Sequence, residues 1–190
     1  MKMKITDKWL NDNGACQEAI TWLKTVKNRD IDNIFNLIVS WENREMLSWG
    51  NWGIVRLMNH EQKIKYAIFA AEQVIDIFEE KYPDDNRPAK AIKAAKNYLN
   101  NPETAKAADA AADAAYDAYA AYAAAYDAAA DAAYATYAAA HAVASAAYAV
   151  AYAASAADAA ADAASAATDA GYAIALKIKI LTYGMQLINS

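Results

Sequence analysis

The fold is decided by residues 109–138, which read DAAADAAYDAYAAYAAAYDAAADAAYATYA. Residues 109–120 recur as residues 127–138 with ten of twelve positions identical. The offset of 18 residues corresponds to about five turns of α-helix, so equivalent side chains point the same way. Neither Gly nor Pro occurs between Pro102 and Gly171, and alanine is the strongest helix former. The repeat predicts helix with tyrosines along one face, aspartates beside them and alanine opposite.

The repeat lies in a longer alanine-rich tract, since 43 of the 52 alanines fall in residues 103–175. One continuous helix of this tract would be ~110 Å long, which exceeds the size of a compact domain. The tract must therefore either bend back on itself or project as a rod. The tyrosines before Ser155 recur at positions on one face of a continuous helix. After Ser155, aspartates occupy the positions that would fall on this face. The change predicts a break at residues 153–157. A second break is expected near residues 139–145.

The rest of the chain reads as conventional helices. Residues 1–102 contain all five tryptophans, with 15 basic and 14 acidic side chains, whereas residues 103–190 contain three basic and nine acidic ones. Three Pro and five Gly leave too few turns for an all-β fold or a βαβ array. We predict an all-α, compact multi-helix bundle. Residues 1–190 would form a single domain, in which the helices of the first half pack on the Ala/Tyr-rich helices of the second.

Several local signals refine this prediction. Asn59 is a suitable cap for a long helix running to about Glu80, and Pro88 suits the first turn of the next helix. Gly50 and Gly53 would let another helix approach closely. Residues 171–188 return to large apolar side chains. We expect this closing segment to pack back on the first half.

Composition excludes several classes of protein. The net charge of −5 leaves no broad basic surface for duplex nucleic acid. Residues 132–157 lack charged side chains but hold only two valines among the strongly apolar types, so we expect no membrane span. A single cysteine, Cys16, cannot form an internal disulfide, and residues 1–4 do not resemble a signal peptide. A cytoplasmic protein is predicted.

No catalytic constellation is visible. The two histidines, His60 and His141, have no second ligand at a spacing typical of zinc or di-iron sites. There is no phosphate-binding loop, dinucleotide fingerprint or nucleophile elbow. We therefore predict a protein that is not an enzyme, with no catalytic residues, cofactor or metal.

Two candidate binding surfaces remain. The first is an acidic face, which is either a solvated surface or a surface that meets a basic protein through electrostatic steering. Its members are Asp109, Asp113, Asp117, Asp127 and Asp131. The second is a set of aromatic and basic residues, which either hold an anionic, nucleotide-like ligand or serve core packing with internal ion pairs. Its members are Trp41, Arg44, Trp49, Trp52, Arg56, Tyr82, Arg87 and His141.

The chain also resembles a family of alanine-rich immunity proteins of bacteria and phages (immunity-protein-five-like). The resemblance rests on CQEA at residues 16–19, SWGNW at 48–52 and FEEKYPDDNRPAKAI at 78–92, and it extends to KILTYG at 179–184. It implies a helical protein that neutralises a toxin or host factor by binding, and it supplies no catalytic residues.

We therefore expect a non-enzymatic protein that neutralises a toxin or host defence factor by forming a protein complex. The alternative is a phage or bacterial protein that sequesters a small nucleotide signal. Either could act as a homo-oligomer.

Overall fold

The computed structural model describes residues 3–40, 44–102, 112–116, 118–119, 121, 131–135, 137–138, 141, 149–167 and 170–190. Over these residues the chain is an all-α fold of helices packed on one another, as predicted. The one β-like feature that they include is an isolated bridge between Lys4 and Asp30.

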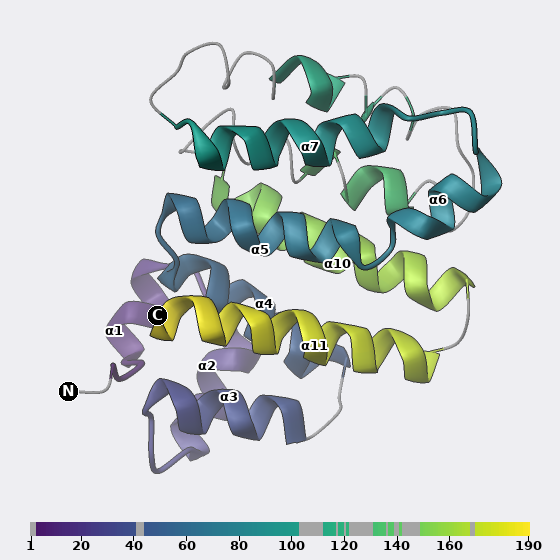
Figure 1. The fold of residues 1–190 in the computed structure, drawn as a ribbon. Helices are drawn as coiled ribbons and strands as arrows, with labels where there is room; N and C mark the ends of the chain where they lie inside the picture. Colours follow the sequence, from purple (N-terminus) through teal and green to yellow (C-terminus); the bar gives the residue numbers. More distant parts are fainter. Residues whose placement is uncertain are drawn as a thin grey trace.

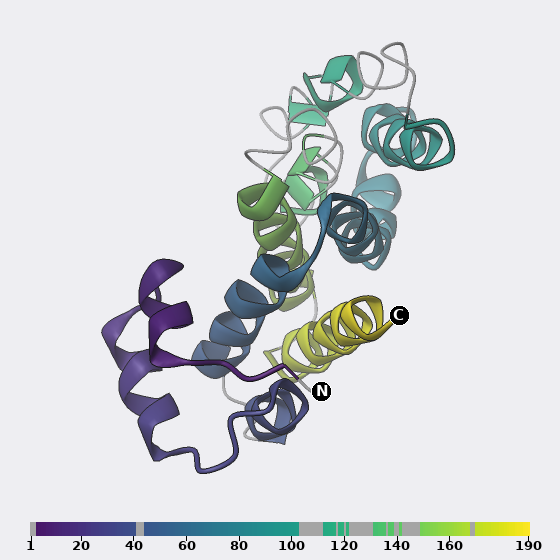
Figure 2. The same cartoon turned by 90° about the vertical axis from the view of Figure 1, so that its left-hand side faces the viewer.

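Three short helices open the chain: α1 (Asp7–Asp12), α2 (Gln17–Thr25) and α3 (Ile31–Ser40). The Thr6 hydroxyl caps α1 by accepting from the backbone N–H of Trp9 at 3.1 Å. The chain turns between α1 and α2 at Gly14, whose φ of 70° favours glycine. Figure 2 shows α1 and α2 on the opposite side of α4 (Arg44–Leu57) from α11 (Ala170–Asn189).

The centre of the fold joins helices that lie far apart in sequence. Helix α10 (Ala149–Ala167) packs on α4, α11 and α5 (His60–Glu72), and α11 also packs on α4 and α5. Figure 1 shows α7 (Arg87–Asn100) on the other side of α5 from α11. The prediction that the closing segment packs on the first half is confirmed.

Alanine forms the packing surface of α10. Its buried alanines are Ala156, Ala157, Ala159, Ala160, Ala161, Ala163 and Ala164. Helix α5, which α10 contacts most extensively, also presents small buried residues, Ala67, Ala70 and Ala71. Small side chains on both helices allow many close contacts between them. The predicted role of alanine as the buried face is confirmed for the described residues.

The predicted break at residues 153–157 is wrong, because α10 continues without interruption through these positions. The break was predicted because Asp158 and later aspartates take the tyrosine positions. In the structure Asp158 pairs with Lys177 of α11 at 2.6 Å. The aspartate thus has a cation partner on another helix while α10 remains continuous. The other expected break, near residues 139–145, lies outside the described residues except for His141.

The helix expected from Asn59 to Glu80 is two helices. Its start is confirmed, since Asn59 and Gln62 form a capping box with two bonds of 2.9 Å. However, α5 ends at Glu72 and α6 (Ile75–Lys81) follows after a turn, where Val74 has φ −135° and ψ −1°. Ala71 before the turn, Val74 within it and Phe78 after it are all buried, so the apolar stripe continues across it. The prediction for Pro88, in the first turn of α7, is confirmed.

Two of the helix-interior glycines mark close contacts. A Cβ on Gly50 would lie 3.1 Å from Ile38 Cγ2 and 3.4 Å from Leu181 Cδ1, which confirms close approach of α3 and α11 at this point. A Cβ on Gly184 would lie 2.8 Å from both Ile54 Cγ2 and Tyr66 Cε2. For Gly53 the same prediction is wrong, because nothing lies within 4 Å of an added Cβ.

Candidate partner-binding face

A hollow of about 320 Å³ lies between α10 and the helical residues 131–135. Its lining consists of Asp131, Tyr134, Ser155, Asp158, Ala159 and Asp162. The four lining residues from α10 fall at positions i, i+3, i+4 and i+7, so they share one face of that helix. Two separate segments of the alanine-rich tract therefore bring three carboxylates to one place.

Asp131 is the electrostatically strained member of the hollow. Burial raises the pKa of its carboxyl above the ordinary value, and repulsion from Asp162 raises it further. Among the described residues no cation contacts Asp131. Its negative charge is thus partly removed from water with no compensating cation among the described residues, which disfavours the charged form.

Asp158 is held differently, by a cation beneath the hollow. Lys177 Nζ donates to Asp158 Oδ1 at 2.6 Å and to Ser48 Oγ at 2.9 Å. The Lys177 side chain is 6% exposed, whereas the Asp158 side chain is 47% exposed. The ammonium therefore fixes one carboxylate at the floor of the hollow and is itself shielded from solvent.

A band of aromatic rings extends from the hollow. The Tyr134 ring lies 5.4 Å from the Tyr137 ring, which lies 5.3 Å from the Tyr119 ring. The hydroxyls of Tyr137 and Tyr152 are 3.3 Å apart, and the His141 ring stacks on Tyr152 at 4.2 Å. Burial, followed by the contact with Tyr152, raises the pKa of Tyr137. The described members of the predicted tyrosine face therefore do gather in space.

The outer end of this band is open to solvent. Tyr119 is 49% exposed, and Tyr116, whose ring lies 6.5 Å from the His141 ring, is 69% exposed. Asp113 is exposed one turn before Tyr116. We use the name tyrosine–aspartate face for the aspartates and tyrosines that join the hollow to the exposed end of the band. Its members are Asp131, Tyr134, Asp158, Asp162, Tyr116, Tyr119 and Tyr137.

The arrangement suits a basic partner. Tyrosine is enriched at the energetic centres of protein interfaces, because it supplies a large, rigid contact area with a polar tip. Carboxylates beside aromatic rings can bind a guanidinium or ammonium through charge-assisted hydrogen bonds and cation–π contact. The described residues contain no group of three or more His, Cys, Asp or Glu side chains that could hold a metal ion.

The acidic residues predicted from sequence are only partly described. Asp131 lines the hollow and Asp113 is exposed, while Asp109, Asp117 and Asp127 lie outside the described residues. Asp158 and Asp162 were not predicted as members of the acidic face. Their helical positions place them on the same face as the tyrosine rings, which could have revealed them. That placement was instead interpreted as evidence of a break in the helix.

The aromatic and basic set is divided among three places. Trp49 and Trp52 line an apolar pocket beside α4. The Arg56 guanidinium stacks on the Trp52 ring at 4.1 Å and donates to the Trp52 carbonyl at 2.9 Å. His141 lies in the tyrosine band.

Arg87 pairs within its own loop with Asp85, at 2.5 Å, and lowers the pKa of that carboxyl. Tyr82, from the same loop, packs on Phe78 with ring centres 5.1 Å apart. Trp41 and the side chain of Arg44 lie outside the described residues. The described members of the set therefore do not line one pocket. No helix in the described part of the chain combines the length and apolar character needed to cross a membrane.

Comparison with known proteins assigns the chain to a family. The family model described as Immunity protein Imm5 matches residues 46–175, well over half of the chain. This span contains every residue that lines the hollow. Neither the curated proteins nor the solved structures gave a match. The chain, with its all-α fold and its match over residues 46–175, belongs to the Imm5 immunity protein family.

Proposed function

We infer that this protein confers immunity by binding a toxin through the tyrosine–aspartate face, and that it neutralises the toxin by forming a complex without chemical change. The family assignment supports a role in toxin immunity. The observation that carries the proposal is the hollow in which Asp131, Asp158 and Asp162 gather, where burial and repulsion from Asp162 disfavour the charged form of Asp131. A positive charge that enters this hollow would relieve the repulsion between the carboxylates.

The proposed binding energy comes from relief of the repulsion between Asp131 and Asp162. A lysine or arginine of the toxin that enters the hollow would replace the repulsion between Asp131 and Asp162 with attraction to both. The partial burial of Asp131 strengthens that attraction relative to a fully solvated charge. The tyrosine band would supply the surrounding contact area and exclude water from the ion pair. The partner is therefore a protein with a basic surface.

A protection assay tests this function. The chain is co-expressed with toxins encoded next to it in its source genome, and growth is compared with that of cells carrying the double variant Asp131→Lys with Asp162→Lys. We expect the natural chain to restore growth and the variant to lose that ability, because the entering cation now meets positive charge.

The matched control is Glu79→Lys with Glu80→Lys, which makes the same change of net charge at two exposed positions of α6. The control should protect as well as the natural chain. Circular dichroism and expression level must be equal for all three proteins. Full protection by the Asp131/Asp162 variant would refute the proposed face.

A further inference from the structure

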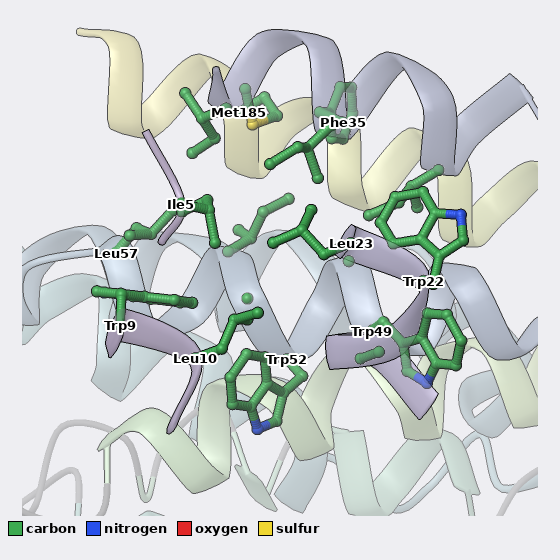
Figure 3. A pocket seen from close by; sticks show the side chains of 17 residues that line it. Ile5, Trp9, Leu10, Trp22, Leu23, Phe35, Trp49, Trp52, Leu57 and Met185 are labelled. Carbon is green, nitrogen blue, oxygen red and sulfur yellow. The ribbon is translucent and has the colours of Figure 1, made fainter. Parts of the chain in front are cut away.

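A second site lies between α4 and the three N-terminal helices, and it shares no lining residue with the tyrosine–aspartate face. It is a cavity of about 70 Å³. Figure 3 shows side chains from α1, α2, α3, α4 and α11 converging on it, with Trp22 and Trp49 at one end and Ile5 and Leu57 at the other. None of its 17 lining residues carries a charge. The cavity therefore offers apolar and aromatic contact and no counter-ion for a charged ligand.

One wall of the cavity is bare backbone at Gly53. Glycine inside a helix lowers stability relative to alanine, so its presence calls for a reason in packing or in binding. At Gly50 and Gly184 the reason is packing, because an added Cβ would meet neighbouring side chains at 3.1 Å or less. At Gly53 nothing lies within 4 Å. The missing side chain leaves open space in the cavity, and no contact of the described residues requires it.

Tryptophan side chains form a second part of the cavity wall. Four of the five tryptophans line the cavity, in two contacting pairs. Trp9 and Trp52 meet edge to face at 5.7 Å, and Trp22 and Trp49 meet at 6.2 Å. Arg56 stacks on Trp52 and restricts its ring further. Paired indoles have few rotatable bonds, so the cavity keeps its shape at low entropic cost when a ligand enters.

We propose that this cavity binds a small, uncharged, apolar ligand that lies against the backbone of Gly53 between the two tryptophan pairs. The volume limits its size, because a cavity of about 150 Å³ lined by aliphatic and aromatic side chains holds benzene or xenon. A ligand of roughly half that size, such as a short branched hydrocarbon group, fits the space. A charged ligand of equal size is excluded, because it would lose its hydration and find no counter-ion.

Xenon and the caesium ion test the site, because they have the same number of electrons and similar sizes but differ in charge. Both are heavy-atom quenchers of tryptophan emission. With the full-length protein, we expect saturable quenching by xenon and only linear, collisional quenching by caesium. Linear quenching by both probes would overturn the proposal, as would the absence of xenon density in the cavity of a crystal held under xenon pressure.

A variant that fills the cavity tests whether the saturable quenching by xenon arises from binding in this cavity. Gly53→Val places two methyl groups in the open space, so the affinity for xenon should fall at least tenfold. Thr21→Val, on the exposed side of α2, is the matched control and should keep the natural affinity. Unchanged saturable quenching in Gly53→Val would contradict the assignment to this cavity.

Gly53→Ala tests whether the glycine is needed for ligand binding or for packing of the helix. The same variant tests the proposal if Gly53→Val fails to fold. The alanine should raise the melting temperature by roughly 2–4 °C through its helix propensity while it weakens xenon binding. A lower melting temperature would show that the bare backbone is needed for folding and would overturn the proposal.

Discussion

Asp158→Asn is expected to lower the free energy of unfolding by about 2–3 kcal/mol, although the change removes only a charge and preserves the shape of the side chain. The cause is Lys177, whose buried ammonium contacts Asp158 and Ser48. Breaking a fully buried pair costs about 3–5 kcal/mol. The expected loss is smaller here because Asp158 is half exposed and solvent screens part of the interaction. Urea unfolding followed by circular dichroism measures it.

A double-mutant cycle isolates the pair. Lys177→Met keeps the length of the side chain without its charge, so the double variant Asp158→Asn with Lys177→Met no longer buries an uncompensated cation. We expect the double variant to be more stable than Asp158→Asn alone. Simple additivity of the two single effects would show that the ion pair does not couple α10 to α11.

Gly184→Ala is expected to destabilise the fold by about 1–3 kcal/mol, despite the higher helix propensity of alanine. The added Cβ would lie 2.8 Å from Tyr66 Cε2 and from Ile54 Cγ2. Tyr66 cannot retreat easily, because it is fully buried and its hydroxyl donates to Asn51 Oδ1 at 2.9 Å. Burial raises the pKa of Tyr66, and nearby Asp158 adds to this effect, so the hydroxyl keeps its proton.

The matched control is Gly53→Ala, the same chemical change in a helix where the Cβ meets nothing. Calorimetric melting of both variants should shift the transition in opposite directions, downward for Gly184→Ala and upward for Gly53→Ala. A melting temperature for Gly184→Ala equal to or above that of the natural protein would show that α11 does not pack so closely on α4 and α5.

Local signals in the sequence predicted the local features of the fold. The Asn59 cap, the Pro88 helix start and the buried alanine face each depend on residues within a few turns of one another. The breaks in the helices were harder to predict because they depend on distant partners. For example, α10 continues past Asp158, and Asp158 pairs with Lys177 in the next helix, which local sequence does not reveal. Likewise, Gly50 and Gly53 differ only in what packs on them.

In the candidate site, too, the features set by nearby residues were predicted and those set by distant residues were not. Asp131 and the tyrosines were recognised because the repeat places them at fixed phase, but the hollow also needs Asp162 from a separate helix. For the aromatic and basic set the sequence left two interpretations open, an anion site or core packing with internal ion pairs. In the structure Arg56 stacks on Trp52 one turn earlier in its own helix, and Arg87 pairs with Asp85 two residues before it. Composition could not show that both are engaged locally.

We propose that the tyrosine–aspartate face binds a basic toxin surface. Isothermal titration calorimetry between the purified protein and the toxin whose growth inhibition it relieves measures this binding. Losing a close charge pair at an interface costs about 2–5 kcal/mol. We therefore predict that Asp131→Lys with Asp162→Lys weakens the complex by at least ~30-fold, while Glu79→Lys with Glu80→Lys leaves the affinity within about twofold of the natural value. Equal affinities for the natural protein and the Asp131/Asp162 variant would contradict the claim.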